Sequence, residues 1–328
     1  MGQVEAAYTP YDDVFRTLLN DCSSLILPVL NEVFGESYTG KEAVVPSQNE
    51  SFLNQQDGKQ EKRVTDSSFE VHGEGIKKYH LECQSSPDSS MLVRFFEYDT
   101  QIALGKGVLE EGVLTVAFPH SAVLFLRCVK STPDRFEIKM VTPGGDLSYP
   151  IPVIKTQRYP MEEILRKNLL FLIPFHIFSY EGRFEDYEKD AQKLEQLVQV
   201  YEQMKNSLEE LLGIGKIDEY TKCTIIDMSK KVLDHIARKY KAVREGVRAV
   251  MGGKILDYEA KAIRDEGKNE GYKEGREEGR EEGREEGREE GIRGTVSVLK
   301  ELQLPPQVIL AKIQKQYQLS PEVSKKYL

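Results

Sequence analysis

The chain has 328 residues, of which 39% are hydrophobic, and its formal net charge is −9. This length allows at least one sizeable hydrophobic core and suggests two modules. The acidic balance weighs against nucleic acid as a partner, unless basic residues are concentrated in one part of the chain.

Targeting and redox features favour a cytoplasmic protein. Residues 1–8 carry a glutamate and no apolar run, which is unlike a signal peptide. The most apolar segment, residues 168–179, is interrupted by Pro174 and is too short to span a bilayer, so no membrane contact is expected. The cysteines are far apart and lack metal-ligand spacing, which favours reduced thiols.

The first expected elements are two helices. Thr9 is a suitable N-cap, Pro10 suits the first helical position, and Asp12 and Asp13 favour the first turn. Apolar residues at helical spacing then continue, with one break, as far as Gly35, which is a suitable stop.

A region of short strands is expected between residues 44 and 154. The predicted strands are residues 63–71, 78–85, 122–129, 136–141 and 149–154. A turn at residues 143–146 separates the last two strands. One helix, residues 90–104, interrupts the strands, and its predicted apolar stripe consists of Met91, Phe95, Tyr98 and Ile102.

The second half is expected to be helical from Met161 onward, including residues 194–212 and 226–250. Residues 267–291 then carry glycine at every fourth position within a Gly-Arg-Glu-Glu repeat. As a helix, this tract would present a glycine stripe that winds by about 40° per repeat. Each glycine costs roughly 1 kcal/mol relative to alanine. The tract has two interpretations: a flexible charged spacer, or a helix that packs its glycine stripe against a second copy of the chain. We favour the helix, and with it a homo-oligomer.

The C-terminal residues 292–328 differ from the rest in charge. They carry six basic and two acidic residues, whereas residues 1–155 carry 14 basic and 22 acidic ones. Three short helices are expected there, over residues 296–302, 305–316 and 320–327. Lysines on such a module are most often simply solvated, but these are the candidate DNA contacts: Lys300, Lys312, Lys315, Lys325 and Lys326.

Two of the predicted strands carry the polar residues that bear on function. In residues 78–85, His80, Glu82 and Gln84 share one face, opposite an apolar face. If the strand over residues 63–71 pairs with it as a hairpin, Asp66 can lie beside Glu82. Two facing carboxylates repel, and a hard cation between them reverses the sign of that interaction. Magnesium would also activate a water for phosphodiester hydrolysis.

This order of residues resembles the PD-(D/E)XK nucleases and, within them, the recombination-promoting nuclease (Rpn) family, which is also described as transposase-like. The matching segments span most of the chain, and each contributes a part of the pattern. They are "YDDVFRTLL" (11–19), "RVTDSSFEV" (63–71), "YHLECQSSPDSSMLVRFFEYD" (79–99), "YPIPVIKTQRYPMEEIL" (149–165) and "MGGKILDYEAK" (251–261).

The resemblance implies an α+β fold with a PD-(D/E)XK core, a mixed sheet flanked by helices. The core would be residues 1–160, with a helical region over 161–266 packed on it, the repeat over 267–291 as a helical linker, and a basic helical module over 292–328. Function would be metal-dependent DNA cleavage linked to recombination or mobile elements. The alternative is a nuclease-fold DNA-binding or scaffold protein without useful turnover.

The resemblance also implies roles for single residues. Asp66 and Glu82 would bind Mg²⁺ or Mn²⁺ together with the backbone carbonyl of Cys83. Gln84 stands where the superfamily has lysine, and its amide would orient the attacking water.

Three further residues would support the site. Asp12 matches an acidic position of the opening element, although an acid in a first turn also suits the helix dipole. Arg94 and Tyr98, four residues apart on one helix face, would brace the site or meet DNA, unless Tyr98 only belongs to the apolar stripe. His80 shares the face of Glu82, and a lone strand histidine is more often a hydrogen-bonded structural residue.

Overall fold

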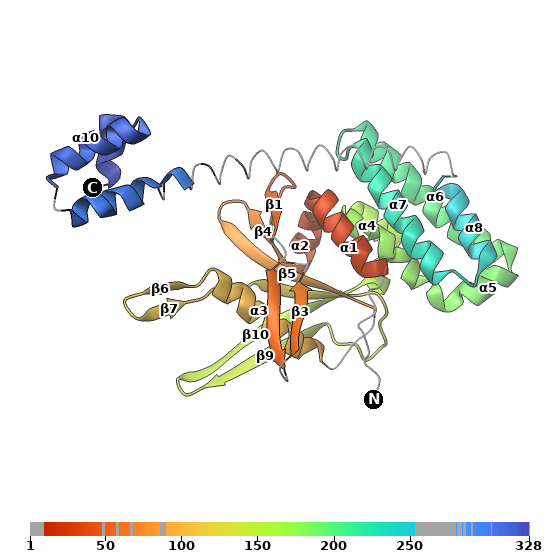
Figure 1. Cartoon of the computed structure of the whole chain (residues 1–328). Helices are drawn as coiled ribbons and strands as arrows, with labels where there is room; N and C mark the ends of the chain where they lie inside the picture. Colours follow the sequence, from red (N-terminus) through yellow and green to blue (C-terminus); the bar gives the residue numbers. More distant parts are fainter. Residues whose placement is uncertain are drawn as a thin grey trace. The chain divides into compact units, whose positions relative to one another are not determined.

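The structure is a computed structural model that describes residues 10–47, 50–56, 59–65, 68–85, 90–252, 280, 284, 287–289, 291–302 and 304–327, with the backbone alone for 50–56 and 59–65. The chain divides into two compact units, Met1–Arg264 and Asp265–Leu328 (Figure 1). The boundary lies close to the start of the glycine repeat at residue 267.

A six-stranded mixed sheet is the centre of the first unit, with strand order β1-β4-β5-β8-β10-β9. β4 pairs antiparallel with β1 and β5, β8 runs parallel to both β5 and β10, and β9 is antiparallel to β10. The expected α+β class, with a mixed sheet flanked by helices, is therefore confirmed. The strands are β1 (Ala43–Pro46), β4 (Ser68–His72), β5 (Ile76–Gln84), β8 (His120–Phe125), β9 (Arg135–Thr142) and β10 (Gly145–Lys155).

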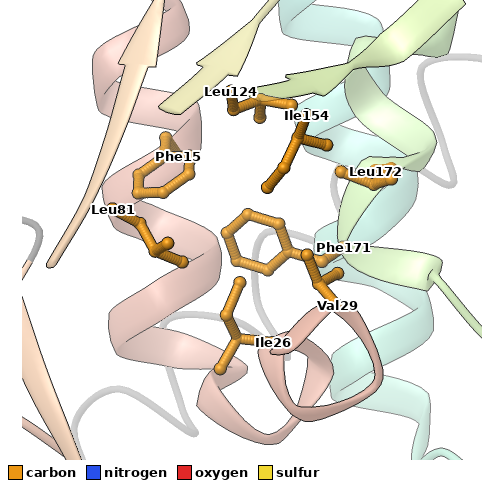
Figure 2. A pocket seen from close by; sticks show the side chains of 8 residues that line it. All are labelled: Phe15, Ile26, Val29, Leu81, Leu124, Ile154, Phe171 and Leu172. Atoms are coloured by element: carbon orange, nitrogen blue, oxygen red, sulfur yellow. The ribbon is translucent and has the colours of Figure 1, made fainter. Parts of the chain in front are cut away.

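Helices cover both faces of this sheet because the side chains of its strands alternate. On one face, α3 (Met91–Gly105) packs Met91 and Phe95 against Val123 and Ile151. The other face packs Leu81 and its neighbours against α1 (Pro10–Asp21), α2 (Leu27–Phe34) and the 3₁₀ helix η3 (Leu170–Ser179). Figure 2 shows a small apolar cavity within this second layer, between Leu81, Phe15 and Phe171.

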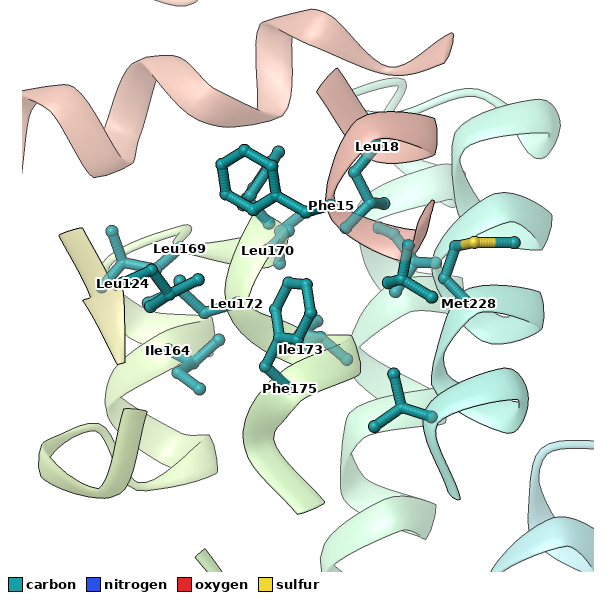
Figure 3. Close-up of a cluster of buried hydrophobic side chains, with 14 of the residues drawn as sticks. Phe15, Leu18, Leu124, Ile164, Leu169, Leu170, Leu172, Ile173, Phe175 and Met228 are labelled. Atoms are coloured by element: carbon teal, nitrogen blue, oxygen red, sulfur yellow. The ribbon is translucent and has the colours of Figure 1, made fainter. Parts of the chain in front are cut away.

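The helical region shares the core of the second layer. Figure 3 shows Phe15 and Leu18 of α1 beside side chains of η3 and Met228 of α7. η3 is a 3₁₀ rather than an α-helix, with Pro174 inside it, and proline has no amide hydrogen to donate to a helix ladder. The remaining helices are α4 (Met161–Arg166), α5 (Phe184–Lys189), α6 (Ala191–Gly213), α7 (Glu219–Ile236) and α8 (Lys241–Val250).

The single helix predicted over residues 226–250 is wrong, because α7 ends at Ile236 and α8 begins at Lys241. Apolar positions keep helical spacing across the break, so periodicity could not show it. The carboxylate of Glu188 accepts hydrogen bonds from the backbone amides of Ala242 and Val243 at the start of α8. This cap comes from a distant helix and leaves no local signal.

The single strand predicted over residues 63–71 is also wrong. β3 (Lys59–Thr65) pairs with β2 (Glu50–Gln56) in a separate two-stranded sheet, and β4 begins at Ser68 in the main sheet. A second small hairpin, β6 (Val108–Glu110) with β7 (Val113–Thr115), was not expected from the sequence and leads from α3 toward β8.

The second unit has a core of its own around Ile292, Val296, Ile309 and Ile313. Residues 291–301 are helical and are followed by α10 (Pro306–Tyr317) and α11 (Pro321–Ser324). The Tyr317 hydroxyl donates to the carbonyl of Gly291 at 2.8 Å, and a Cβ on Gly291 would lie 3.5 Å from that hydroxyl. Most of the repeat lies outside the described residues. Across the part of the chain that is described, no helix is both long and apolar enough to cross a membrane.

Candidate functional site

Glu82 and Gln84 lie at the carboxyl end of β5, where they stand opposite Val123 and Phe125 of the parallel strand β8. They share the face of the sheet that α3 covers, because His80, two residues before Glu82, contacts α3. The amide of Gln84 donates to Oε2 of Glu82 at 3.1 Å. The Glu82 side chain is 19% exposed, so it lies near the surface while its carboxylate is largely buried.

The Glu82 carboxylate is held in its ionised form. Burial alone would raise its pKa, but the hydrogen bond and positive charge of His80, the charge of Arg94 and the Gln84 amide together lower the pKa below its ordinary value. Oε1 of Glu82 lies 3.2 Å from His80 and Oε2 accepts from Gln84, and each carboxylate oxygen carries two lone pairs. An ionised carboxylate oxygen is a donor that suits a hard divalent cation.

Asp66, the other predicted metal ligand, lies outside the described residues. The described pairing of β4 with β5 begins at Ser68, which stands opposite His80. Cys83, whose carbonyl was the third predicted ligand, pairs with Leu124 of β8. Among the residues that the structure describes, no group of three or more histidine, cysteine, aspartate or glutamate side chains is arranged to hold a metal ion.

A buried polar network extends inward from Glu82. His80 has no exposed surface, and its Nε2 lies 3.2 Å from Oε1 of Glu82 while its Nδ1 lies 2.7 Å from Oδ1 of Asp99. Asp99, on α3, is also fully buried and accepts from the hydroxyls of Ser121 at 2.7 Å and Tyr149 at 3.1 Å. These partners come from β5, α3, β8 and β10.

Sequence reasoning missed Asp99, Ser121 and Tyr149. The buried stripe of α3 contains Met91, Phe95, Asp99 and Ile102, whereas the predicted stripe had Tyr98 in place of Asp99. An aspartate at the i+4 position after Phe95, within an apolar stripe, was the available signal. Ser121 and Tyr149 carried none, because only the folded sheet brings their strands to the same helix.

Arg94 and Tyr98 lie near the same network. The positive charge of Arg94 is one cause of the lowered pKa of Glu82, and its guanidinium donates to Oγ of Ser90 at 3.0 Å. The Tyr98 ring is half-buried, and its centroid lies 6.0 Å from that of His80, nearly perpendicular to it. The structure thus brings both predicted helix residues to the side of β5 that carries Glu82.

The start of α1 approaches the same strand from the opposite face. Burial raises the pKa of the Cys83 thiol, and the negative charges of Asp12 and Glu82 raise it further. Tyr11, the neighbour of Asp12, lies under the guanidinium of Arg127, which donates two hydrogen bonds to Glu181. The charge of Asp12 therefore acts on Cys83, the residue next to Glu82 in the chain.

The predicted DNA contacts of the tail all belong to the second unit. Each of the five lysines is exposed there: Lys300, Lys312, Lys315, Lys325 and Lys326.

Comparison of the chain with protein-family models, with curated proteins and with solved structures found no match.

Proposed function

We propose that this protein is a metal-dependent DNA endonuclease with a PD-(D/E)XK core of the Rpn type. The observation that carries the proposal is the carboxylate of Glu82 at the end of a central strand, which is kept ionised by its neighbours and accepts a hydrogen bond from Gln84. Ser68 pairs with His80 in the antiparallel ladder of β4 and β5. In the sequence, Asp66 comes two residues before Ser68, and Glu82 comes two residues after His80. This equal spacing supports Asp66 as the second ligand within the proposal.

The proposal gives each residue a role. Asp66, Glu82 and the Cys83 carbonyl would hold Mg²⁺ or Mn²⁺, which supplies a water of lowered pKa and offsets phosphate charge. Gln84 donates a hydrogen bond to Glu82 through its amide NH₂. Its amide oxygen is an acceptor and would take a hydrogen bond from the attacking water. Arg94 supplies positive charge for a DNA phosphate, while Tyr98 and Asp12 support the site from either face.

The test is cleavage of supercoiled plasmid DNA by the purified full chain with and without Mg²⁺ or Mn²⁺. We expect cleavage only with metal, and Asp66→Asn and Glu82→Gln should each lower the rate by more than about 100-fold. Glu74→Gln, in the exposed turn before β5, is the matched control and should leave the rate unchanged. Cleavage at the original rate by the Asp66→Asn/Glu82→Gln double variant would refute the proposal. Metal-independent DNA binding without cleavage would instead favour the DNA-binding or scaffold function.

Gln84 should affect the rate more than the binding of metal. Gln84→Ala removes one of the two hydrogen bonds described on Glu82 but no proposed ligand. We expect a rate about 10–100-fold lower, with the Mn²⁺ dissociation constant changed less than about threefold in isothermal titration. Gln84→Lys should keep part of the activity. Equal losses of Mn²⁺ affinity in Gln84→Ala and Asp66→Asn would contradict this role.

The proposal also includes the exposed lysines of the second unit as DNA contacts and the repeat as a self-association element. Phosphate contacts release counterions, so each lost contact should flatten the salt dependence of affinity by about 0.9 in the log–log slope. We expect a flatter slope for a chain ending at Glu266 and for a full-length variant with all five lysines changed to glutamine. Only the shorter chain should also change oligomeric state in light scattering. Unchanged slopes and an unchanged mass would refute both parts.

A further inference from the structure

His80 is a buried histidine with a carboxylate on each ring nitrogen. Its Nδ1 lies 2.7 Å from Asp99 and its Nε2 lies 3.2 Å from Glu82. Carboxylate oxygens accept hydrogen bonds, so either ring nitrogen can donate to its carboxylate neighbour, and both donate when the ring is protonated. Burial alone would lower the pKa of His80, but the two carboxylates outweigh it and raise the pKa to about 9.

The imidazolium is fixed in place from several elements. Asp99 is itself held by the hydroxyls of Ser121 and Tyr149, which belong to β8 and β10. The ring of Phe95 lies 5.0 Å from the His80 ring, and the ring of Tyr98 lies 6.0 Å from it. The ring therefore has hydrogen-bond partners in its plane and aromatic neighbours around it, and its Nε2–H points at one oxygen of Glu82.

A chain of buried charges is costly to build, and apolar residues of similar volume often stabilise a fold as well or better. Here the chain runs from hydroxyls in the core through Asp99 and His80 to Glu82. Asp99 and His80 are fully buried, whereas Glu82 is 19% exposed. The network thus connects fully buried residues to a side chain that is partly exposed. Ligating carboxylates commonly depend on such outer hydrogen bonds for their orientation.

We propose that His80, anchored by Asp99, is a positioning residue that fixes the Glu82 carboxylate in the orientation needed to bind a divalent cation. This inference rests on the proposed nuclease function. His80 does not touch substrate in this role. It holds Oε1 of Glu82 while Gln84 holds Oε2, so both oxygens of the carboxylate are fixed by side chains of the same strand.

Two substitutions of His80 separate positioning from simple structural support. In His80→Gln the side-chain amide takes the place of Nε2, which keeps a donor toward Glu82 and loses the one toward Asp99. In His80→Asn the amide takes the place of Nδ1, which keeps the donor toward Asp99 and loses the one toward Glu82. Both variants lack the positive charge and one hydrogen bond, so their electrostatic effect on a bound cation is matched.

The experiment measures Mn²⁺ binding by isothermal titration and plasmid cleavage at saturating Mn²⁺, using the full chain. We expect His80→Asn to lose about 10–100-fold in Mn²⁺ affinity or cleavage rate, and His80→Gln to stay within about threefold of the original protein. Equal losses in the two variants would overturn the inference. An original protein that neither binds Mn²⁺ nor cleaves DNA would overturn the proposed function itself, so the two failures are distinct.

Folding of each variant is checked by its urea midpoint. Where a His80 variant does not fold, Tyr149→Phe replaces it, because this change removes one hydrogen bond to Asp99 and leaves His80 and Glu82 in place. Because the Tyr149 hydroxyl acts on Glu82 only through Asp99 and His80, we expect a measurable loss of Mn²⁺ affinity or rate that is smaller than the loss of about 10–100-fold for a direct outer-shell partner. Unchanged binding and cleavage in Tyr149→Phe would then overturn the inference.

Discussion

Replacing Phe171 with alanine is expected to lower the free energy of unfolding by about 3–5 kcal/mol. Phe171 lies in η3 and is 1% exposed, and its ring meets that of Phe15 edge to face at 5.2 Å. It also borders the small apolar cavity of Figure 2. Truncation would enlarge a void that is already present, and η3 is packed between other elements, so the site has little freedom to collapse.

The measurement is urea denaturation followed by circular dichroism. The matched control is Phe96→Ala on α3, because Phe96 is 38% exposed and should cost less than about 1 kcal/mol. A loss below about 1.5 kcal/mol for Phe171→Ala would mean that η3 relaxes into the space, contrary to the close packing inferred from its burial.

The elements next to Glu82 could be predicted from the sequence because their signals are local. Strict alternation along residues 78–85 predicted β5 and the common face of His80, Glu82 and Gln84, and helical spacing predicted α3 nearly to the residue. Both signals come from a single segment. The start of β4 could not be predicted from the sequence. Polar and apolar residues alternate without a break along residues 63–71, although the strand that pairs with them changes from β2 to β5.

The network behind Glu82 could not be predicted in the same way. His80 was expected as a structural histidine, and the structure does give it hydrogen bonds in the core. Its partner Asp99 is 19 residues away in sequence, and Tyr149 reaches Asp99 from 50 residues away. Such contacts depend on which strands lie next to one another, and no local pattern encodes that order. The network is therefore a product of topology rather than of any motif.

Stability should depend on pH through His80. Its pKa of about 9 in the folded protein exceeds the value of about 6.5 for an unfolded chain. A pKa raised by folding contributes stability that is fully present below the unfolded value and is lost as pH rises toward the folded one. Between pH 6.5 and 8.5 we therefore expect the free energy of unfolding to fall by roughly 2–3 kcal/mol.

The other buried histidines and the cysteines each change the free energy of unfolding between pH 6.5 and 8.5 by less than His80 does. Burial lowers the pKa of His120, and it lowers that of His176 to about 4, so their unfolded forms release protons within the window and each adds at most about 0.4 kcal/mol of stability, which opposes the fall only slightly. Burial raises the pKa of Cys22 and of Cys223 to about 11, and thiols in an unfolded chain ionise only near pH 8.5. Their contribution, like that of Cys83 and Cys128, whose thiol pKa values burial also raises, therefore grows toward the upper end of the window and lowers stability in the same direction.

Urea midpoints measured across this range should fall for the original protein and fall much less for His80→Gln. Ser229→Ala is a suitable control for the loss of a buried hydrogen bond without a titrating group, since Ser229 donates to the carbonyl of Ile225 on α7. It should lower stability by a constant amount and keep the slope with pH. A slope in His80→Gln equal to that of the original protein would show that His80 is not the group that titrates, and that the charge assigned to its ring is wrong.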